Sequence, residues 1–195
     1  MKVQIEKTFP MPASAEVSWQ LLQDIVAVAA CMPGARITER LDDTHYKGTV
    51  TIRVGPATLS FRGDIEVREL DPATRTLRVI GKGSDTTGTS AASLDLTARM
   101  EAAEGGQSNL VGKSEASVSG KAAAFGGRMM NSVADQILKE FAANFAARVE
   151  ALKEPQASAA PAAPSPPAQR ELNALAMFWA ILKDWMSGFF SKKRG

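Results

Sequence analysis

Apolar side chains between Lys121 and Leu152 recur with the period of an α-helix. The ones that repeat at every fourth position are Val133, Ile137, Phe141, Phe145 and Val149. Polar and charged residues fill most of the other positions, so one side of the segment is apolar and the other is polar. The pattern predicts one long amphipathic helix over 121–152, which needs an extended apolar surface to cover.

Between Arg36 and Ser119 the pattern changes to alternation, with apolar residues at every second position. The two clearest segments, 46–54 and 57–67, flank Gly55-Pro56, which predicts a tight connection between two strands. Similar segments near 76–82, 94–100 and 110–118 predict further strands. Strands with one apolar and one polar face are typical of an antiparallel sheet that is covered on one side.

The first part of the chain predicts a strand and two short helices. Val3, Ile5 and Lys7 alternate with polar neighbours, and prolines end this strand. Ser14 is a suitable N-cap for a helix, and a second helical piece over 26–32 ends at Pro33-Gly34. The predicted order is therefore strand, helix pair, several antiparallel strands and a long helix.

Several inward positions of the predicted sheet carry small residues: Gly48, Gly63, Gly112, Ser114 and Ala116. Small residues either let the long helix pack closely against the sheet or leave a cavity beneath it. Their occurrence on several strands favours a cavity.

Five short motifs follow one another in a characteristic order and spacing. They are Cys31-Met32-Pro33-Gly34-Ala35, Tyr46-Lys47-Gly48, Val54-Gly55-Pro56-Ala57, Phe61-Arg62-Gly63 and Phe125-Gly126-Gly127-Arg128-Met129. With these motifs, residues 1–152 resemble the CoxG family, the G subunit of carbon monoxide dehydrogenase, in the START/Bet v 1-like (SRPBCC) superfamily.

This resemblance implies an α+β helix-grip fold, in which a curved antiparallel sheet wraps around a long C-terminal helix. It also implies service to a molybdenum-containing carbon monoxide dehydrogenase or a related hydroxylase. The protein would either recruit that enzyme to the membrane or carry quinone between the bilayer and the enzyme.

The charge distribution divides the chain into a domain and a tail. Residues 1–154 are nearly neutral, whereas 155–195 carry five basic and two acidic side chains. A nucleic-acid partner is not expected, because that would need basic residues gathered on the domain. The single cysteine excludes an intramolecular disulfide and fits a reducing compartment. The first residues lack the apolar core of a secretory signal, so a cytoplasmic protein is expected.

The tail has two parts. Residues 155–169 consist mainly of Pro, Ala, Ser and Gln, which predicts a flexible linker. Residues 170–195 predict a separate amphipathic helix with a basic end. The residues expected to bind the inner face of the cytoplasmic membrane are Leu175, Phe178, Trp179, Leu182, Trp185, Met186, Phe189, Phe190, Lys192, Lys193 and Arg194.

Three interpretations of this helix remain open. A helix lying in the membrane interface is favoured, because two tryptophans and a basic end suit anionic headgroups. A transmembrane span would bury Lys183 and Asp184, each at a cost of about 2.5–3.5 kcal/mol near the bilayer centre. The third interpretation is docking onto protein.

The sequence contains few groups that could catalyse a reaction. His45 follows two aspartates at the start of a strand and is interpreted as an exposed loop-edge residue. Cys31 is interpreted as a small buried apolar residue. Metal sites need several clustered ligands, and a second His or Cys is missing. We therefore predict a non-enzymatic protein without a cofactor.

Methionines near the start of the long helix suggest an adaptable apolar site. Met129 and Met130 follow Gly126 and Gly127, which either precede the helix as loop residues or permit an adaptable entrance. Strand alternation and helix phase together predict a set of ligand-binding residues. They are Tyr46, Val50, Ile52, Leu59, Phe61, Leu94, Leu96, Phe125, Met129, Met130, Val133 and Ile137.

The leading hypothesis is a carrier of a hydrophobic small molecule, a quinone or a lipid, tethered to the inner face of the cytoplasmic membrane. The alternative is an assembly or membrane-recruitment adaptor for the same enzyme with an empty pocket. An enzyme of the cyclase or hydrolase type on this scaffold would need a polar dyad inside the pocket, and the sequence suggests none.

Overall fold

The computed structural model describes residues 1–153 of the 195-residue chain. The linker predicted at 155–169 and the tail helix predicted at 170–195 lie outside these residues. The described strands are β1 (Lys2–Met11), β2 (Ala35–Arg40), β3 (His45–Val54), β4 (Ala57–Asp71), β5 (Thr76–Asp85), β6 (Ser90–Ala102) and β7 (Ser108–Gly120). The helices are α1 (Ala15–Leu22), α2 (Ile25–Cys31) and α3 (Gly126–Lys153), with 3₁₀ turns η1 (Glu104–Gly106) and η2 (Lys121–Phe125).

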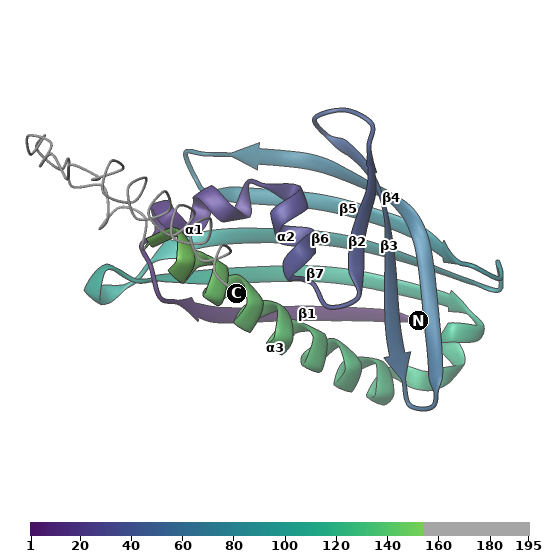
Figure 1. The fold of residues 1–195 in the computed structure, drawn as a ribbon. Helices are drawn as coiled ribbons and strands as arrows, with labels where there is room; N and C mark the ends of the chain where they lie inside the picture. The colour runs from purple at the N-terminus through teal and green to yellow at the C-terminus, as the bar shows by residue number, and fades with distance from the viewer. Residues whose placement is uncertain (154–195) are drawn as a thin grey trace, which may run out of the picture. The chain divides into compact units, whose positions relative to one another are not determined.

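The strands form one curved antiparallel sheet in the order β1-β7-β6-β5-β4-β3-β2. Strands β2 to β7 follow one another as a meander. Strand β1 pairs with β7 and forms the other edge of the sheet. Helices α1 and α2 connect the two edge strands, and all three helices lie on the inner face of the sheet (Figure 1). This arrangement confirms the predicted α+β helix-grip fold.

Capping side chains begin the first two helices, and the cap predicted at Ser14 is one of them. Ser14 caps α1, because its side-chain oxygen accepts a hydrogen bond from the backbone N–H of Val17 at 3.3 Å. Asp24 caps α2 by accepting from the N–H of Ala27 at 3.0 Å. The hairpin between β3 and β4 turns at Gly55, as the alternation on both sides predicted.

The long helix begins later than the sequence pattern predicted. Lys121–Phe125 form the 3₁₀ turn η2, and the α-helix starts at Gly126. The reason is the backbone of Gly126, whose φ of +78° is in the left-handed region that favours glycine. The prediction of one helix from 121 is therefore wrong over its first five residues, and Phe125 belongs to η2.

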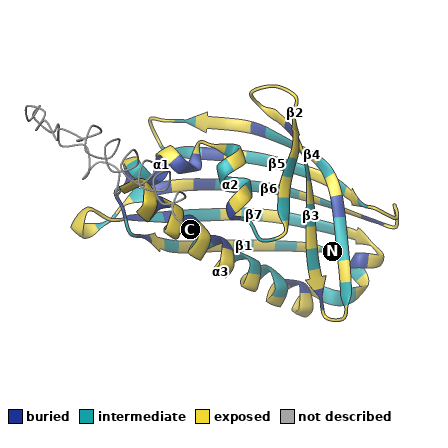
Figure 2. Cartoon of the chain, viewed as in Figure 1, coloured by how far each residue is buried: buried dark blue, intermediate teal, exposed yellow. Residues whose placement is uncertain are grey.

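The buried hydrophobic residues, coloured dark blue on the ribbon of Figure 2, belong to two hydrophobic clusters, one toward each end of α3. The larger, here the α1 cluster, joins the C-terminal part of α3 to α1 and the neighbouring strands. Its large buried members include Met11, Trp19, Leu22, Met100, Leu110, Phe141, Phe145 and Val149. The smaller, here the hairpin cluster, has Val54, Phe61, Ala122 and Met130 as its buried members.

Candidate ligand-binding cavity

A hollow lies between the inner face of the sheet and helices α2 and α3. Its first compartment, here the α2 compartment, has a volume of about 370 Å³ and lies beside α2 and the middle of α3. Its second, here the hairpin compartment, has a volume of about 400 Å³ and extends toward the hairpin cluster. The two compartments adjoin, since they share the lining residues Ala29, Ala35, Ile37, Val50, Ile65, Gly81 and Leu94.

All the small inward residues that the sequence pointed out line this hollow. Gly112 and Ser114 of β7 border the α2 compartment. Gly48, Gly63 and Ala116 border the hairpin compartment. Of the two alternatives left open by the sequence, close packing and a cavity, the structure has the cavity in this part of the domain.

The glycines of the lining have two different physical roles. A Cβ atom added to Gly112 would meet no atom within 4 Å, so this glycine leaves open space. A Cβ atom added to Gly63 would lie 2.0 Å from the carbonyl oxygen of Lys82, so this glycine permits close approach of β4 and β5. Only the first kind sets the volume of the hollow.

Seven of the twelve residues proposed as ligand contacts line the hollow. Val50 and Leu94 border both compartments, and Leu96 borders the α2 compartment. The other four border the hairpin compartment and are Ile52, Phe61, Met130 and Ile137. They come from β3, β4, β6 and α3, so the fold brings distant segments together around one space.

The remaining five lie elsewhere. Tyr46 is buried near the start of β3, where its hydroxyl donates a hydrogen bond to the carbonyl oxygen of Asp43 at 3.1 Å. Leu59, Phe125 and Val133 pack against the hairpin cluster. Met129 is 41% exposed, because residues four apart drift around a helix of 3.6 residues per turn and Met129 lies three such steps before the buried Phe141.

Residues of β1 and α2 also line the α2 compartment and were not among the predicted contacts. They include Ile5, Lys7, Phe9, Val28 and Met32. The alternation along β1 already places Ile5 and Lys7 on the same face of the strand as Val3. What the sequence lacked was the pairing of β1 with β7, which brings this edge strand next to the hollow.

Apart from Ser114, the lining of the α2 compartment is apolar, and Lys7 is its one charged residue among those that the structure describes. Its ammonium nitrogen lies 3.1 Å from a carboxylate oxygen of Asp135 on α3. The two side chains are 47% and 60% exposed, so this ion pair is where the compartment meets water. The interior therefore offers apolar burial, with a polar group at its edge.

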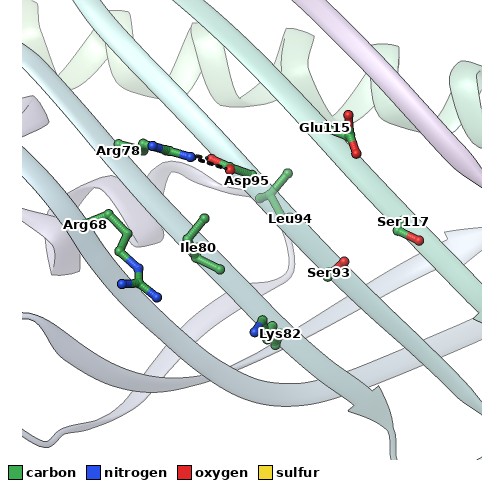
Figure 3. A pocket seen from close by; sticks show the side chains of 9 residues that line it. All are labelled: Arg68, Arg78, Ile80, Lys82, Ser93, Leu94, Asp95, Glu115 and Ser117. Carbon is green, nitrogen blue, oxygen red and sulfur yellow. Dashed lines mark hydrogen bonds and ion pairs between the residues drawn. The ribbon is translucent and has the colours of Figure 1, made fainter.

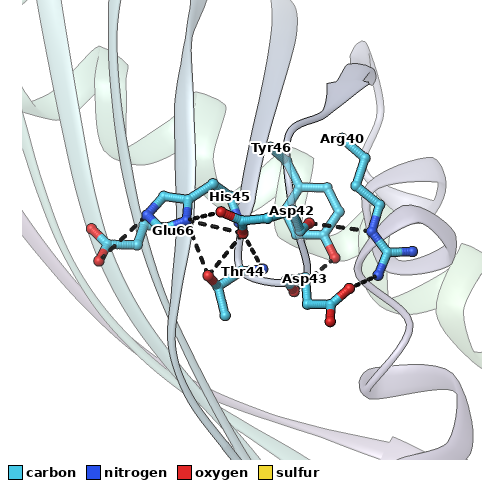
Figure 4. Close-up of polar contacts among 7 residues, drawn as sticks. All are labelled: Arg40, Asp42, Asp43, Thr44, His45, Tyr46 and Glu66. Carbon is cyan, nitrogen blue, oxygen red and sulfur yellow. Dashed lines mark hydrogen bonds and ion pairs between the residues drawn. The ribbon is translucent and has the colours of Figure 1, made fainter.

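The loop before β3 holds the histidine in a network that belongs to the turn (Figure 4). The carboxylate of Asp42 accepts hydrogen bonds from the backbone N–H groups of Thr44 and His45, each at 2.7 Å. The first of these bonds contributes most to lowering the pKa of Asp42 well below its usual range. His45 Nδ1 lies 2.9 Å from the same carboxylate, and its side chain is half-exposed. This position confirms the interpretation of His45 as an exposed loop-edge residue.

The opposite, outer face of the sheet has a shallow polar depression (Figure 3). Arg78 on β5 and Asp95 on β6 point toward each other across it, with a nitrogen–oxygen distance of 2.8 Å. The hydrogen bond from Arg78 lowers the pKa of Asp95. These paired, exposed charges are typical of a solvated sheet face.

Cys31 lies at the end of α2 and is fully buried. Burial raises the pKa of its thiol, which donates a hydrogen bond to the carbonyl oxygen of Ala27. The interpretation of Cys31 as a small buried residue is confirmed.

Residues 1–153 contain neither a candidate metal-ion cluster nor a candidate membrane-spanning helix. No group of three or more His, Cys, Asp and Glu side chains is placed there to hold a metal ion. None of the helices in this part of the chain combines the length and apolar content that crossing a bilayer requires.

Several solved structures have the same fold as this chain. A conserved protein from Geobacillus kaustophilus is 19% identical to this chain with a TM-score of 0.68. The aligned region covers 76% of this chain and 96% of that protein's chain. A START superfamily protein from Mycobacterium smegmatis is 20% identical with a TM-score of 0.57, covering 76% and 98%. The Zhui aromatase/cyclase from Streptomyces sp. R1128 is 15% identical with a TM-score of 0.56, covering 77% and 94%. At these identities the likeness concerns the fold alone.

No curated protein sequence matches the chain. The family model of the carbon monoxide dehydrogenase G subunit (CoxG) matches residues 8–150, which is most of the chain and nearly all of the described domain. Together with the helix-grip fold, this match means that the chain belongs to the CoxG family.

Proposed function

We propose that this protein is a non-enzymatic carrier of a hydrophobic small molecule, a quinone or a lipid. The observation that carries the proposal is the continuous hollow beneath α3, with an almost wholly apolar lining. Removal of apolar surface from water stabilises a complex by about 25 cal/mol per Å². A site of this kind binds by burial and tolerates variation in the apolar part of its ligand.

The size of the hollow supports this proposal. Pockets that bind drug-sized molecules have volumes of roughly 300–1,000 Å³. Each compartment, at about 370 and 400 Å³, is within this range. A ligand that occupies both compartments would extend from the β1 side of the domain toward the hairpin cluster.

The tail supplies the second part of the proposal, which is attachment to the inner face of the cytoplasmic membrane. The predicted amphipathic helix at 170–195 would lie in the membrane interface, and the predicted linker would leave the carrier domain free to move near it. Tethering of this type keeps the local concentration of the domain high without further contacts.

The family supplies the third part, which is the partner. We infer that the protein serves a carbon monoxide dehydrogenase-type enzyme, because the matching family is named for the G subunit of that enzyme. Its role would be to deliver the hydrophobic molecule to the enzyme, to recruit the enzyme to the membrane, or both.

The first experiment concerns cargo. The full chain is purified from a bacterial host under native conditions, and its organic extract is analysed by mass spectrometry. We expect a quinone or a lipid at close to one molecule per chain. Gly112→Leu should remove it by filling the open space of the α2 compartment. Lys113→Leu is the matched control, because the next residue on β7 points to the opposite face and is exposed.

The outcomes separate the carrier from the adaptor. Loss of cargo in Gly112→Leu alone supports the carrier. An empty wild-type protein that still binds the enzyme and the membrane supports the adaptor with an empty pocket.

Membrane attachment is tested by flotation of the full chain with phosphatidylglycerol-containing vesicles. Phe178→Glu combined with Phe189→Glu should abolish flotation, because both side chains belong to the predicted membrane-binding face. Equal flotation of this variant and the wild type would contradict the proposed role of the tail.

A further inference from the structure

Lys7 occupies a position where the pattern of its strand calls for an apolar side chain. It lies between Ile5 and Phe9 on the inward side of β1, and all three line the α2 compartment. Successive inward residues of a strand share one face. A lysine on this face can lay its methylene stem along the apolar wall while its ammonium reaches water.

The ammonium is at a seam between two elements. β1 is an edge strand of the sheet, and α3 passes beside it (Figure 1). The Lys7–Asp135 ion pair spans this seam, with both side chains about half-exposed. The pair therefore lies at the mouth of the compartment.

The space next to Lys7 is open. Lys7 pairs in register with Gly112 on β7. Gly112 is the glycine at which an added Cβ atom would meet nothing within 4 Å. A ligand in the compartment can therefore place one end beside the ammonium without displacing a side chain at position 112.

The charge of the pair restricts what can bind there. An ammonium group has three hydrogen atoms to donate, and the ion pair with Asp135 does not use all of them. Since Asp135 already neutralises the ammonium, an uncharged oxygen can accept a hydrogen bond without leaving a charge unpaired. An anionic group at this place would be repelled by the carboxylate of Asp135.

From these observations we propose that Lys7 binds the uncharged, oxygen-bearing end of the ligand, a carbonyl or a hydroxyl, while the apolar chain fills the hollow. The proposal rests on the proposed carrier function and narrows the ligand to molecules with a neutral hydrogen-bond acceptor at one end. A purely apolar hydrocarbon or a fatty-acid anion would fit less well.

The test compares two probes that share one apolar skeleton, all-trans-retinol and all-trans-retinoic acid. The full chain is stripped of bound molecules and titrated with retinol, followed by retinol fluorescence, and retinoic acid is measured by competition. The wild type should bind retinol more tightly than retinoic acid. Lys7→Met keeps an apolar stem of similar length and should weaken retinol binding about ten-fold, the loss expected for a hydrogen bond to a charged group.

Three further variants sharpen the result. Lys7→Arg keeps charged donors and should retain most retinol affinity. Asp135→Asn leaves the ammonium unpaired and should shift the preference toward retinoic acid. Lys113→Met is the matched control, because Lys113 is exposed on the outer face of β7, and it should leave both affinities unchanged.

The outcomes keep the two proposals apart. If Lys7→Met binds retinol as the wild type does while Gly112→Leu does not bind it, the hollow is the binding site and the role of Lys7 is overturned. Tighter binding of retinoic acid than of retinol by the wild type would overturn the proposal that Lys7 binds an uncharged end of the ligand. If the wild type binds neither probe, or Gly112→Leu binds retinol normally, the carrier proposal itself fails.

Discussion

The two halves of α3 have the same amphipathic pattern and meet the sheet in different ways. In the C-terminal half, Phe141, Phe145 and Val149 are buried in the α1 cluster. In the N-terminal half only Met130 is buried, and Val133 and Ile137 are partly exposed. The difference comes from the facing residues. Large side chains of β1 and α1 fill the space in one half, and small residues of β7, Gly112 above all, leave open space next to the other.

Polar contacts follow the same division. Asn144 donates a hydrogen bond to the carbonyl oxygen of Cys31 at 3.0 Å, and Arg148 donates to that of Ala27 at 3.3 Å. These contacts fix α2 to the C-terminal half of α3. The N-terminal half has the exposed pair of Lys7 and Asp135 instead. One half of the helix therefore holds the fold together, and the other half covers the hollow.

The largest effect is expected from a matched pair of valines on this helix. Val149→Ala removes methyl groups from a fully buried site and should lower the free energy of unfolding by about 2–3 kcal/mol, which is within the range for large-to-small core substitutions. Val133→Ala, at a partly exposed site, should cost less than about 1 kcal/mol. Urea denaturation of the full chain measures both. Equal losses would mean that the two halves pack alike.

The next comparison uses the two kinds of glycine. Gly63→Ala brings a methyl group against the backbone of Lys82 and should cost about 1–3 kcal/mol, as overpacking does. Gly112→Ala enters open space and should be neutral or stabilise the fold by up to about 1 kcal/mol. Thermal unfolding of the two variants checks this. A larger loss of stability for Gly112→Ala than for Gly63→Ala would contradict the open space at position 112.

The smallest effect concerns the loop carboxylate of Asp42, far from the division between the halves of α3. Folding lowers its pKa, so the folded state binds fewer protons. Its contribution to stability is therefore present above the ordinary pKa of about 3.9 and is lost as the pH falls through the folded value. Asp42→Ala should be less stable than the wild type at pH 7, and this difference should shrink below about pH 4.

The matched control is Asp43→Ala. The carboxylate of Asp43 pairs with Arg40 on the surface and accepts no backbone bond of the turn. We expect it to lose less stability at pH 7 than Asp42→Ala, measured by urea denaturation over a series of pH values. The reverse order would contradict the role of the turn.

The sequence predicted the fold and part of the wall on the strand side. Alternation placed Val50, Ile52 and Phe61 on the inward face, and the structure places them against the hollow. Helix period placed Val133 to Val149 on one face of α3. It could not distinguish the packed half from the open half, because that depends on the volume of side chains contributed by distant strands.

The predicted contacts that lie away from the hollow do so for local reasons. The left-handed backbone at Gly126 shifts the start of α3, so Phe125 lies in η2. Met129 is exposed because the four-residue spacing of the predicted apolar positions drifts around a helix of 3.6 residues per turn. Tyr46 is on the inward side, but the register of β3 places it beyond the hollow. The sequence does not point to Lys7, because a charged residue on a strand is usually exposed, and only the pairing of β1 with β7 places it beside the hollow.

The central claim is that α3 and the sheet enclose an apolar space that a ligand can occupy. The most direct test is a xenon titration of the stripped full chain followed by ¹²⁹Xe NMR, since apolar cavities bind xenon whatever their natural ligand is. The wild type should show a saturable shift that Gly112→Leu abolishes and Lys113→Leu leaves intact. The same shift in the wild type and Gly112→Leu, or no saturable shift in either, would contradict the claim.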